Sequence, residues 1–168
     1  RERLVEFVHH HPESMHVRTA YFELANYYYS RKQMKNALEW YDKVKLRDLD
    51  TEEAVDYHFK RGYAQFKKER FAEAKVSFAH LIDTPNRYSA PAKYYYAHLA
   101  YQDKNYDAAL TRFRELDADP SFAPLVPYYV VQILFLQGDF EEVVSYGPSR
   151  LESADLKKEY EVARIIGE

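Results

Sequence analysis

One pattern of small and aromatic side chains recurs along this chain, and it constrains the fold more than any other feature of the sequence. Ala37, Ala74 and Ala109 are separated by 37 and 35 residues. Each follows Met, Phe or Tyr by three positions and precedes Tyr or Phe by four. A period of about 35 residues is typical of two-helix units that bury their apolar faces against one another. The sequence therefore predicts an all-α chain built from helix pairs.

A second set of small residues lies twelve positions upstream of the first: Ala25, Gly62 and Ala97. Where a helix carries a small residue, its neighbour can approach closely because no large side chain stands between them. A fourth, weaker copy of the pattern has Val131 and Val143 in the two places, with Gly138 in the turn between them. We therefore expect four nearly complete helix pairs.

The apolar periodicity and the prolines together set the expected helix boundaries. The predicted helices are residues 2–10, 17–31, 34–46, 52–68, 71–83, 88–103, 106–117, 122–137, 140–152 and 154–166. Pro12, Pro85 and Pro120 fall where a helix has already stopped. Pro148, which follows Gly147, falls inside the helix that starts at Phe140, so a kink or a break is expected there.

Composition and charge restrict the classes of partner. The chain of 168 residues has no cysteine, which excludes disulfides, thiolate metal sites and a cysteine nucleophile. Its net charge of −3 argues against a general electrostatic grip on phosphate backbones. Its unbroken apolar runs are far shorter than the roughly 20 residues that a membrane span requires. We expect neither nucleic-acid binding nor membrane insertion of this chain.

These repeats resemble tetratricopeptide repeats (TPR), helix–turn–helix units of about 34 residues with small side chains at the eighth and twentieth positions. The similarity covers residues 18–51, 55–86, 90–120 and, in part, 124–151. It implies a right-handed α-solenoid of antiparallel helix pairs, a single array over residues 1–168. Residues 1–12 match the end of a preceding repeat and residues 154–168 the start of a truncated one. By that resemblance we expect a fragment of a longer array.

The resemblance also implies a binding surface, because the first helices of TPR units line a concave groove. The predicted contact residues are Phe22, Asn26, Tyr29, Phe59, Tyr63, Phe66, Tyr94, His98, Tyr101, Tyr128 and Gln132. Asn26, Tyr63, His98 and Gln132 form a polar row at the ninth position, between aromatic rows at the fifth and the twelfth; Phe135 takes the twelfth position of the fourth unit. The alternative is that the aromatic rows only hold neighbouring repeats together, since apolar stripes at helical spacing are usually core.

Large residues occupy the fourth position of TPR units, and this chain departs from that pattern. Tyr21 fits, whereas His58, Lys93 and Pro127 stand in the later units. We therefore expect atypical packing at those three places.

No residue pattern here favours catalysis, a metal or a cofactor. The histidines at 9–11 suggest a metal site, but histidines at a helix C-terminus that interact with free carbonyls are the simpler account. His58 and His98 have no serine or carboxylate at a spacing that makes a triad. Nor is there a glycine loop that could cradle phosphate. The protein is therefore not expected to be an enzyme.

The leading hypothesis is a non-enzymatic scaffold whose groove holds a peptide segment or a helix of a protein partner. The clamp by which some TPR domains hold a terminal carboxylate is excluded, because Phe22, Tyr95 and Pro91 stand where basic residues are needed. The RNA-binding pentatricopeptide family has a similar period but needs a basic groove, and only Lys60 and Lys67 are basic here.

Two other classes of function stay open. Tyrosine-rich grooves can stack on sugar rings, so a glycan-binding module is one alternative. A purely structural spacer within a larger envelope protein is the other. The sequence also resembles the long TPR arrays of bacterial cell-envelope proteins, which implies a periplasmic or outer-membrane-associated parent.

Overall fold

The computed structural model describes residues 15–151, together with Glu6 and His10. Over these residues the protein is all-helical, with eight α-helices, one short 3-10 helix and no strand. The predicted helices 2–10 and 154–166 lie outside the described residues, apart from Glu6 and His10. No described helix combines the length and the apolar character needed to cross a bilayer.

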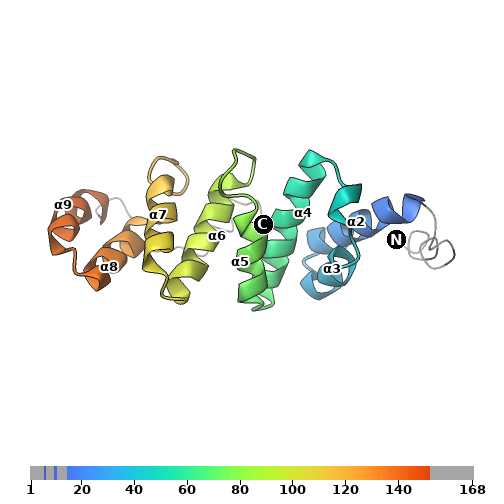
Figure 1. Ribbon diagram of the computed structural model, residues 1–168, viewed down its shortest axis with the longest axis horizontal. Helices are drawn as coiled ribbons and strands as arrows, with labels where there is room; N and C mark the ends of the chain where they lie inside the picture. Colours follow the sequence, from blue (N-terminus) through green and yellow to red (C-terminus); the bar gives the residue numbers. More distant parts are fainter. Residues whose placement is uncertain (1–5, 7–9, 11–14, 152–168) are drawn as a thin grey trace. The chain divides into compact units, whose positions relative to one another are not determined.

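The chain divides into two compact units, Arg1–Leu81 and Ile82–Glu168. The first unit holds α2 (Met15–Ser30), α3 (Met34–Tyr41), the 3-10 helix η1 (Leu46–Asp48), α4 (Thr51–Lys67) and α5 (Phe71–Ala79) (Figure 1). The second holds α6 (Ser89–Gln102), α7 (Tyr106–Leu116), α8 (Pro127–Gln137) and α9 (Phe140–Leu151). Within each unit, helices that follow one another in the chain pack together as pairs. Whether the pairs form a single array over residues 1–168 stays a prediction.

The turns inside the four pairs share one backbone geometry. Each contains a residue with positive φ: Lys32 (58°), Glu69 (59°), Lys104 (60°) and Gly138 (80°). The next N–H returns to the carbonyl five residues earlier, with N···O distances of 3.0 Å for Gln33–Tyr28 and 2.9 Å for Arg70–Gln65, Asn105–Ala100 and Asp139–Leu134. This is the Schellman closure of a helix C-terminus. The left-handed residues precede Ala37, Ala74, Ala109 and Val143 by five positions each, so the backbone repeats with the period of the sequence.

Helix starts differ in how they are capped. Asp50 begins α4 with a full capping box: the Glu53 N–H donates to the Asp50 carboxylate at 2.8 Å, and the Asp50 N–H donates to the Glu53 carboxylate at 3.0 Å. Asp139 accepts the Glu142 N–H at 3.2 Å and holds the first turn of α9.

Three predicted boundaries were wrong, one of them in the helix predicted for 71–83, which ends at Ala79. The helix predicted for 34–46 ends at Tyr41, and residues 46–48 form the separate 3-10 helix. The helix predicted for 122–137 begins at Pro127, because a proline has no N–H for a helix interior and fits the first turn. Before it, the Asp119 carboxylate accepts the N–H groups of Ser121 (2.9 Å) and Phe122 (3.3 Å) in a local turn. Of the kink or break expected at Gly147 and Pro148, the break does not occur, because α9 continues to Leu151, and a kink stays a prediction. Pro148 lies in the last described turn, where it removes one backbone donor.

Small residues mark the closest helix contacts. The five alanines of the repeat pattern are fully buried: Ala25, Ala37, Ala74, Ala97 and Ala109. At Gly62 a Cβ atom would lie 3.0 Å from Ser77 Cβ and 3.1 Å from Phe78 Cε1, so α4 meets α5 without room for a methyl group. Around these contacts Phe22, Tyr41 and Tyr57 join the core of the first unit.

Tyr129 is a half-buried ring that contacts several aromatic side chains of the second unit. It stacks on Phe113 of α7 with 4.8 Å between ring centroids and 5° between ring planes. On the α6 side it meets the rings of Tyr94 at 6.4 Å and Tyr101 at 5.8 Å, both edge-on. Such contacts add about 0.5–1.5 kcal/mol per pair beyond the area they bury. Tyr129 thus joins α8 to both helices of the preceding pair.

Replacing Gly62 by Val should lower the free energy of unfolding by about 1–3 kcal/mol, because the new side chain overpacks the contact with Ser77 and Phe78. Urea titration followed by circular dichroism measures the effect. The control is Ala72→Val, an exposed position on α5 where only helix propensity changes, by a few tenths of a kcal/mol. Equal stability of Gly62→Val and wild type would contradict the close approach of α4 and α5.

Replacing Glu69 by Gly should stabilise the protein by about 0.5–1 kcal/mol, because a left-handed backbone is strained for a residue that carries Cβ. The neighbouring substitution Lys68→Gly is the matched control: Lys68 has φ of −101°, so glycine should give no comparable gain. A thermal melt of both variants distinguishes them. A loss of stability in Glu69→Gly would show that its left-handed geometry carries no cost.

Candidate functional site

The second unit carries an open pocket of about 300 Å³ between α6 and α8. Its walls are Tyr101 from α6 and Val131, Gln132, Phe135 and Leu136 from α8. Apolar walls with one or two placed polar groups are the usual composition of sites that hold a side chain and orient what is attached to it. Two of these wall residues, Tyr101 and Gln132, are among the predicted contact residues.

A chain of hydrogen bonds fixes the polar wall of this pocket. The Tyr101 hydroxyl donates to Gln132 Oε1 at 3.0 Å, and Gln132 Nε2 donates to the Tyr128 hydroxyl at 2.6 Å. Burial raises the pKa of Tyr101, and the neighbouring hydroxyls of Tyr106 and Tyr128 act in the same direction, so Tyr101 keeps its proton and donates. The chain uses one lone pair and one N–H of the Gln132 amide, and an amide has one more of each to offer.

Apolar side chains continue outward from the pocket at the end of α8. Phe135 is 60% exposed, Leu136 54% and Phe140 57%, and we call these three residues the α8–α9 patch. The rings of Phe135 and Phe140 meet edge-on with centroids 5.4 Å apart. Tyr128, the last member of the hydrogen-bonded chain, is 41% exposed. A contiguous exposed patch of this kind marks an interaction surface more often than a scattered apolar residue does.

Four of the predicted contact residues are buried within their units: Phe22, Phe59, Tyr63 and Tyr94. Phe59 and Tyr63 stack at 6.5 Å on α4, and Tyr94 meets Phe113 edge-on at 6.2 Å. In this conformation the four rings offer no surface to a partner, in keeping with the alternative that aromatic rows hold helices together. They are therefore left out of the proposed contact set.

The remaining aromatic positions of the first unit are half-buried. The Tyr29 ring meets Tyr63 edge-on at 6.2 Å, and the Phe66 ring meets Phe71 at 5.7 Å. Both rings are thus engaged with neighbouring helices or turns, and each keeps part of its surface exposed.

Asn26 joins three helices of the first unit. Its Oδ1 accepts from the Tyr41 hydroxyl of α3 at 2.9 Å and from Lys60 Nζ of α4 at 3.1 Å. Lys60 also forms an ion pair with Asp56 at 2.8 Å. The Asn26 side chain therefore stabilises the packing of these three helices.

The histidine of the polar row lies beside the pocket. His98 Nε2 is 3.3 Å from Gln102 Nε2, and its ring meets Tyr129 edge-on at 5.8 Å. Tyr129 in turn contacts Tyr101. Of the predicted contact residues, the structure therefore gathers Tyr101, Tyr128 and Gln132 at the pocket, with His98 next to them.

Phe135, Leu136 and Phe140 are the exposed residues that the predicted contact set missed. Phe135 takes the twelfth position of the fourth unit, and this place in the aromatic row was the signal that could have included it. Leu136 and Phe140 lie off the groove positions of the repeat pattern.

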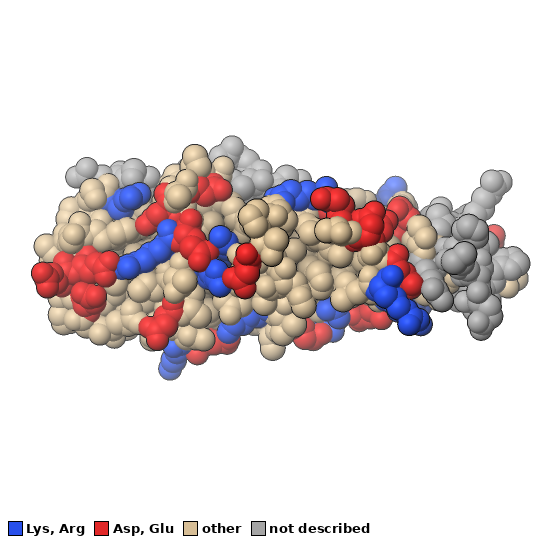
Figure 2. Space-filling view, turned by 45° about the horizontal axis from the view of Figure 1, so that its top comes forward, with Lys and Arg blue, Asp and Glu red and all other residues tan. Residues whose placement is uncertain are grey.

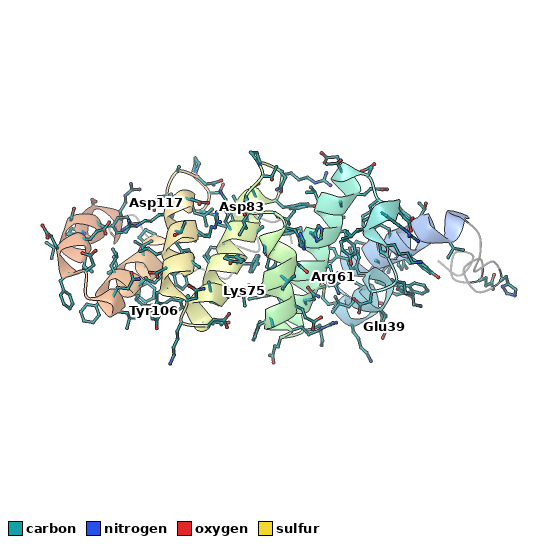
Figure 3. All side chains as sticks on the ribbon, in the orientation of Figure 1. Glu39, Arg61, Lys75, Asp83, Tyr106 and Asp117 are labelled. Atoms are coloured by element: carbon teal, nitrogen blue, oxygen red, sulfur yellow. The ribbon has the colours of Figure 1, made fainter. Side chains whose placement is uncertain are left out.

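At two of the three atypical fourth positions the partners are polar, whereas the third, Pro127, is buried at the start of α8. Lys93 forms an ion pair with Glu115 of α7 at 2.8 Å. The His58 ring stacks on His80 with centroids 4.1 Å apart and planes at 22°. Burial lowers the pKa of His58 to about 4, and the neighbouring His80 and Arg61, which projects from α4 in Figure 3, add to the shift.

Two further features of the described residues are their potential metal ligands and their surface charge. Among the described residues no three His, Asp or Glu side chains gather to hold a metal. Of the histidines at 9–11 only His10 is described, and its Nδ1 lies 2.7 Å from the Glu6 carbonyl oxygen. On the face in Figure 2, acidic and basic side chains are interspersed.

A second concavity, of about 450 Å³, lies at the turns of the first unit. It is lined by Lys32, Gln33, Met34, Lys35, Asn36, Lys67 and Lys68. Four lysines and no aromatic ring give it a chemistry opposite to that of the pocket between α6 and α8.

No protein-family model matches the chain, and no curated protein matches it in sequence. The likeness to TPR units therefore rests on the residues and the backbone of this chain alone.

The His58→Phe variant should weaken the dependence of stability on acid. Between the usual histidine pKa of about 6.5 and the folded value of about 4, the unfolded chain binds a proton that the folded chain refuses, so stability falls as pH falls through that window. Phenylalanine keeps the ring and removes the titration. Thermal melts at pH 7 and pH 4.5 should therefore differ less in His58→Phe than in wild type.

His80→Phe is the matched control, because it removes only the neighbouring charge and should change the pH dependence less. If His58→Phe and wild type lose the same stability between the two pH values, His58 does not titrate as its burial implies.

Proposed function

We propose that this protein is a non-enzymatic interaction scaffold of the TPR type, which binds a segment of a protein partner along the first helices of its units. The observation that carries the proposal is the pocket between α6 and α8, where two tyrosine hydroxyls orient the amide of Gln132 beside exposed aromatic rings. In this proposal the helix pairs are antiparallel and stack as a right-handed α-solenoid.

The repeated backbone supports this architecture. Four Schellman turns stand at the same offset from the small residue of each unit, and the small residues of the complete units are buried. Two helices joined by so short a turn bury their facing stripes against one another, and further pairs can cover what is left.

The pocket can supply both affinity and direction. An apolar side chain of the partner would bury itself against Phe135, Leu136 and Val131, and anchors of this kind carry most of the energy of an interface. The unused lone pair and N–H of Gln132 match the N–H and C=O of a peptide group. Because Tyr101 and Tyr128 already hold this amide in place, little side-chain entropy is lost when it binds.

Glycan binding is the second candidate, and the exposed rings of Tyr128 and Phe135 favour it. An exposed aromatic face can stack on the apolar face of a sugar ring, and the Gln132 amide could accept or donate to its hydroxyls. A spacer function would leave the pocket without a ligand.

Selection from a phage-displayed library of random 12-residue peptides tests the proposal. Peptides that bind the chain are synthesised with a fluorescent label, and their affinities are measured by anisotropy. Phe135→Ala should weaken binding about 30-fold, equivalent to about 2 kcal/mol, because it removes an anchor wall. Gln132→Ala should weaken it about tenfold. Both positions are at least partly exposed, so equal helicity by circular dichroism is expected.

Val76→Ala, on α5, is the control because Val76 is 63% exposed and belongs to the other unit. If Phe135→Ala and Gln132→Ala leave the affinity of the selected peptides unchanged, these peptides bind elsewhere on the chain. Oligosaccharides that change tyrosine fluorescence while no peptide is selected would favour the glycan function. If neither class of ligand binds, the spacer function is supported.

A further inference from the structure

Acidic residues surround the α8–α9 patch. The turn from α6 to α7 and the turn from α8 to α9 lie at the same edge of the second unit (Figure 1). Residues 102–107 and 137–141 of these turns carry four carboxylates and a single lysine: Asp103, Asp107, Asp139, Glu141 and Lys104. All five side chains are exposed.

Contacts between the turns and the pocket place three of these carboxylates beside it. Asp107 accepts a hydrogen bond from Gln137 at 2.6 Å, directly after the pocket wall Leu136. Asp139 and Glu141 flank Phe140, whose ring touches that of Phe135.

The α7 side gives a second link between the acidic turns and the pocket. Tyr106 begins α7 next to Asp107, and its ring lies 5.8 Å from that of Tyr101, the α6 wall of the pocket (Figure 3).

The three carboxylates are not neutralised by the described residues. Asp107, Asp139 and Glu141 form no ion pair with any residue that the structure describes. Other carboxylates of the second unit are paired: Arg112 with Asp83 at 2.8 Å and with Glu115 at 3.0 Å, and Arg114 with Glu142. Three exposed carboxylates of the second unit therefore have no ion-pair partner among the described residues.

We infer that the partner segment carries one apolar anchor, an aromatic or long aliphatic side chain, with Lys or Arg on either side of it. This inference rests on the proposed function, because it names the chemistry of the segment that the pocket takes. A volume of about 300 Å³ suits one anchor side chain with its backbone. Exposed carboxylates in high dielectric add steering and register to an affinity that the anchor supplies, and they repel acidic segments.

Two labelled synthetic peptides with the same centre test the inference, GKKGFLGKKG and GEEGFLGEEG. In 50 mM NaCl the lysine peptide should bind at least tenfold more tightly than the glutamate peptide, as measured by anisotropy. Raising the salt to 500 mM should weaken the lysine peptide, because screening reduces the attraction between exposed charges. Peptides from the random library should show the same enrichment of Lys and Arg next to Phe or Leu.

The triple variant Asp107→Asn, Asp139→Asn, Glu141→Gln removes the three charges while asparagine can still cap α9 and bond Gln137. It should weaken the lysine peptide about fivefold to tenfold and reduce the salt effect. The matched control, Glu23→Gln, Glu39→Gln, Glu52→Gln, removes three exposed carboxylates of the first unit and should change neither.

The outcomes separate the inference from the proposed function. The charge preference is overturned if acid-flanked or neutral peptides bind as well as the lysine peptide, or if the triple variant leaves affinity unchanged. If Phe135→Ala still weakens binding in that case, the scaffold function stands. Selected acidic peptides that lose affinity on Lys67→Ala would instead point to the lysine-lined concavity and overturn the inference. If neither probe binds and the library yields no peptide, both fail.

Discussion

The structure depends on helices that approach each other where a side chain is missing. At Gly62 one added carbon would lie 3.0 Å from Ser77 Cβ, and the buried Ala25 and Ala97 hold the equivalent places in the first and third pairs. At that distance two buried polar side chains can reach each other across the helices, and Gln65 and Ser77 are hydrogen-bonded at 2.7 Å. Aromatic rings pack between the same helices beside these contacts, as Phe59 of α4 does against Phe78 of α5 with ring centroids 6.0 Å apart.

Local patterns made the helix pairs predictable from the sequence. The small residues, the aromatics three positions before them and the prolines at helix ends all act within about one turn, so their effect does not depend on distant packing. The start of α8 was predicted wrongly although Pro127 marks it, because a proline has no N–H for a helix interior and fits the first turn. The left-handed turns were not predicted either, because three of the four left-handed positions hold Lys or Glu rather than glycine: Lys32, Glu69 and Lys104.

The candidate site was less predictable, because exposure is a property of neighbours. Phe22 and Phe59 of the fifth-position row are buried, whereas Tyr128 of the same row is 41% exposed. Nothing in the repeat pattern separates them. The adjacent Tyr128 and Tyr129 also differ: Tyr129 is half-buried and stacks on Phe113, whereas Tyr128 is exposed. The hydrogen bonds that fix Gln132 involve Tyr101, 31 residues away in sequence, and Tyr128, four residues away. The repeat period alone does not predict these partners.

Trp40 has a consequence for how the two units can be followed. The chain has one tryptophan and 17 tyrosines. Trp40 lies in the first unit, where Lys43 Nζ is 4.2 Å from its ring centroid and the centroid of the Tyr21 ring is 6.0 Å away. Tryptophan emission can be excited apart from tyrosine, so it reports on the surroundings of α3, whereas circular dichroism averages over every helix. Chains built from repeats need not unfold as one block. A difference between the two optical signals during denaturation would measure the cooperativity between the units without any added label.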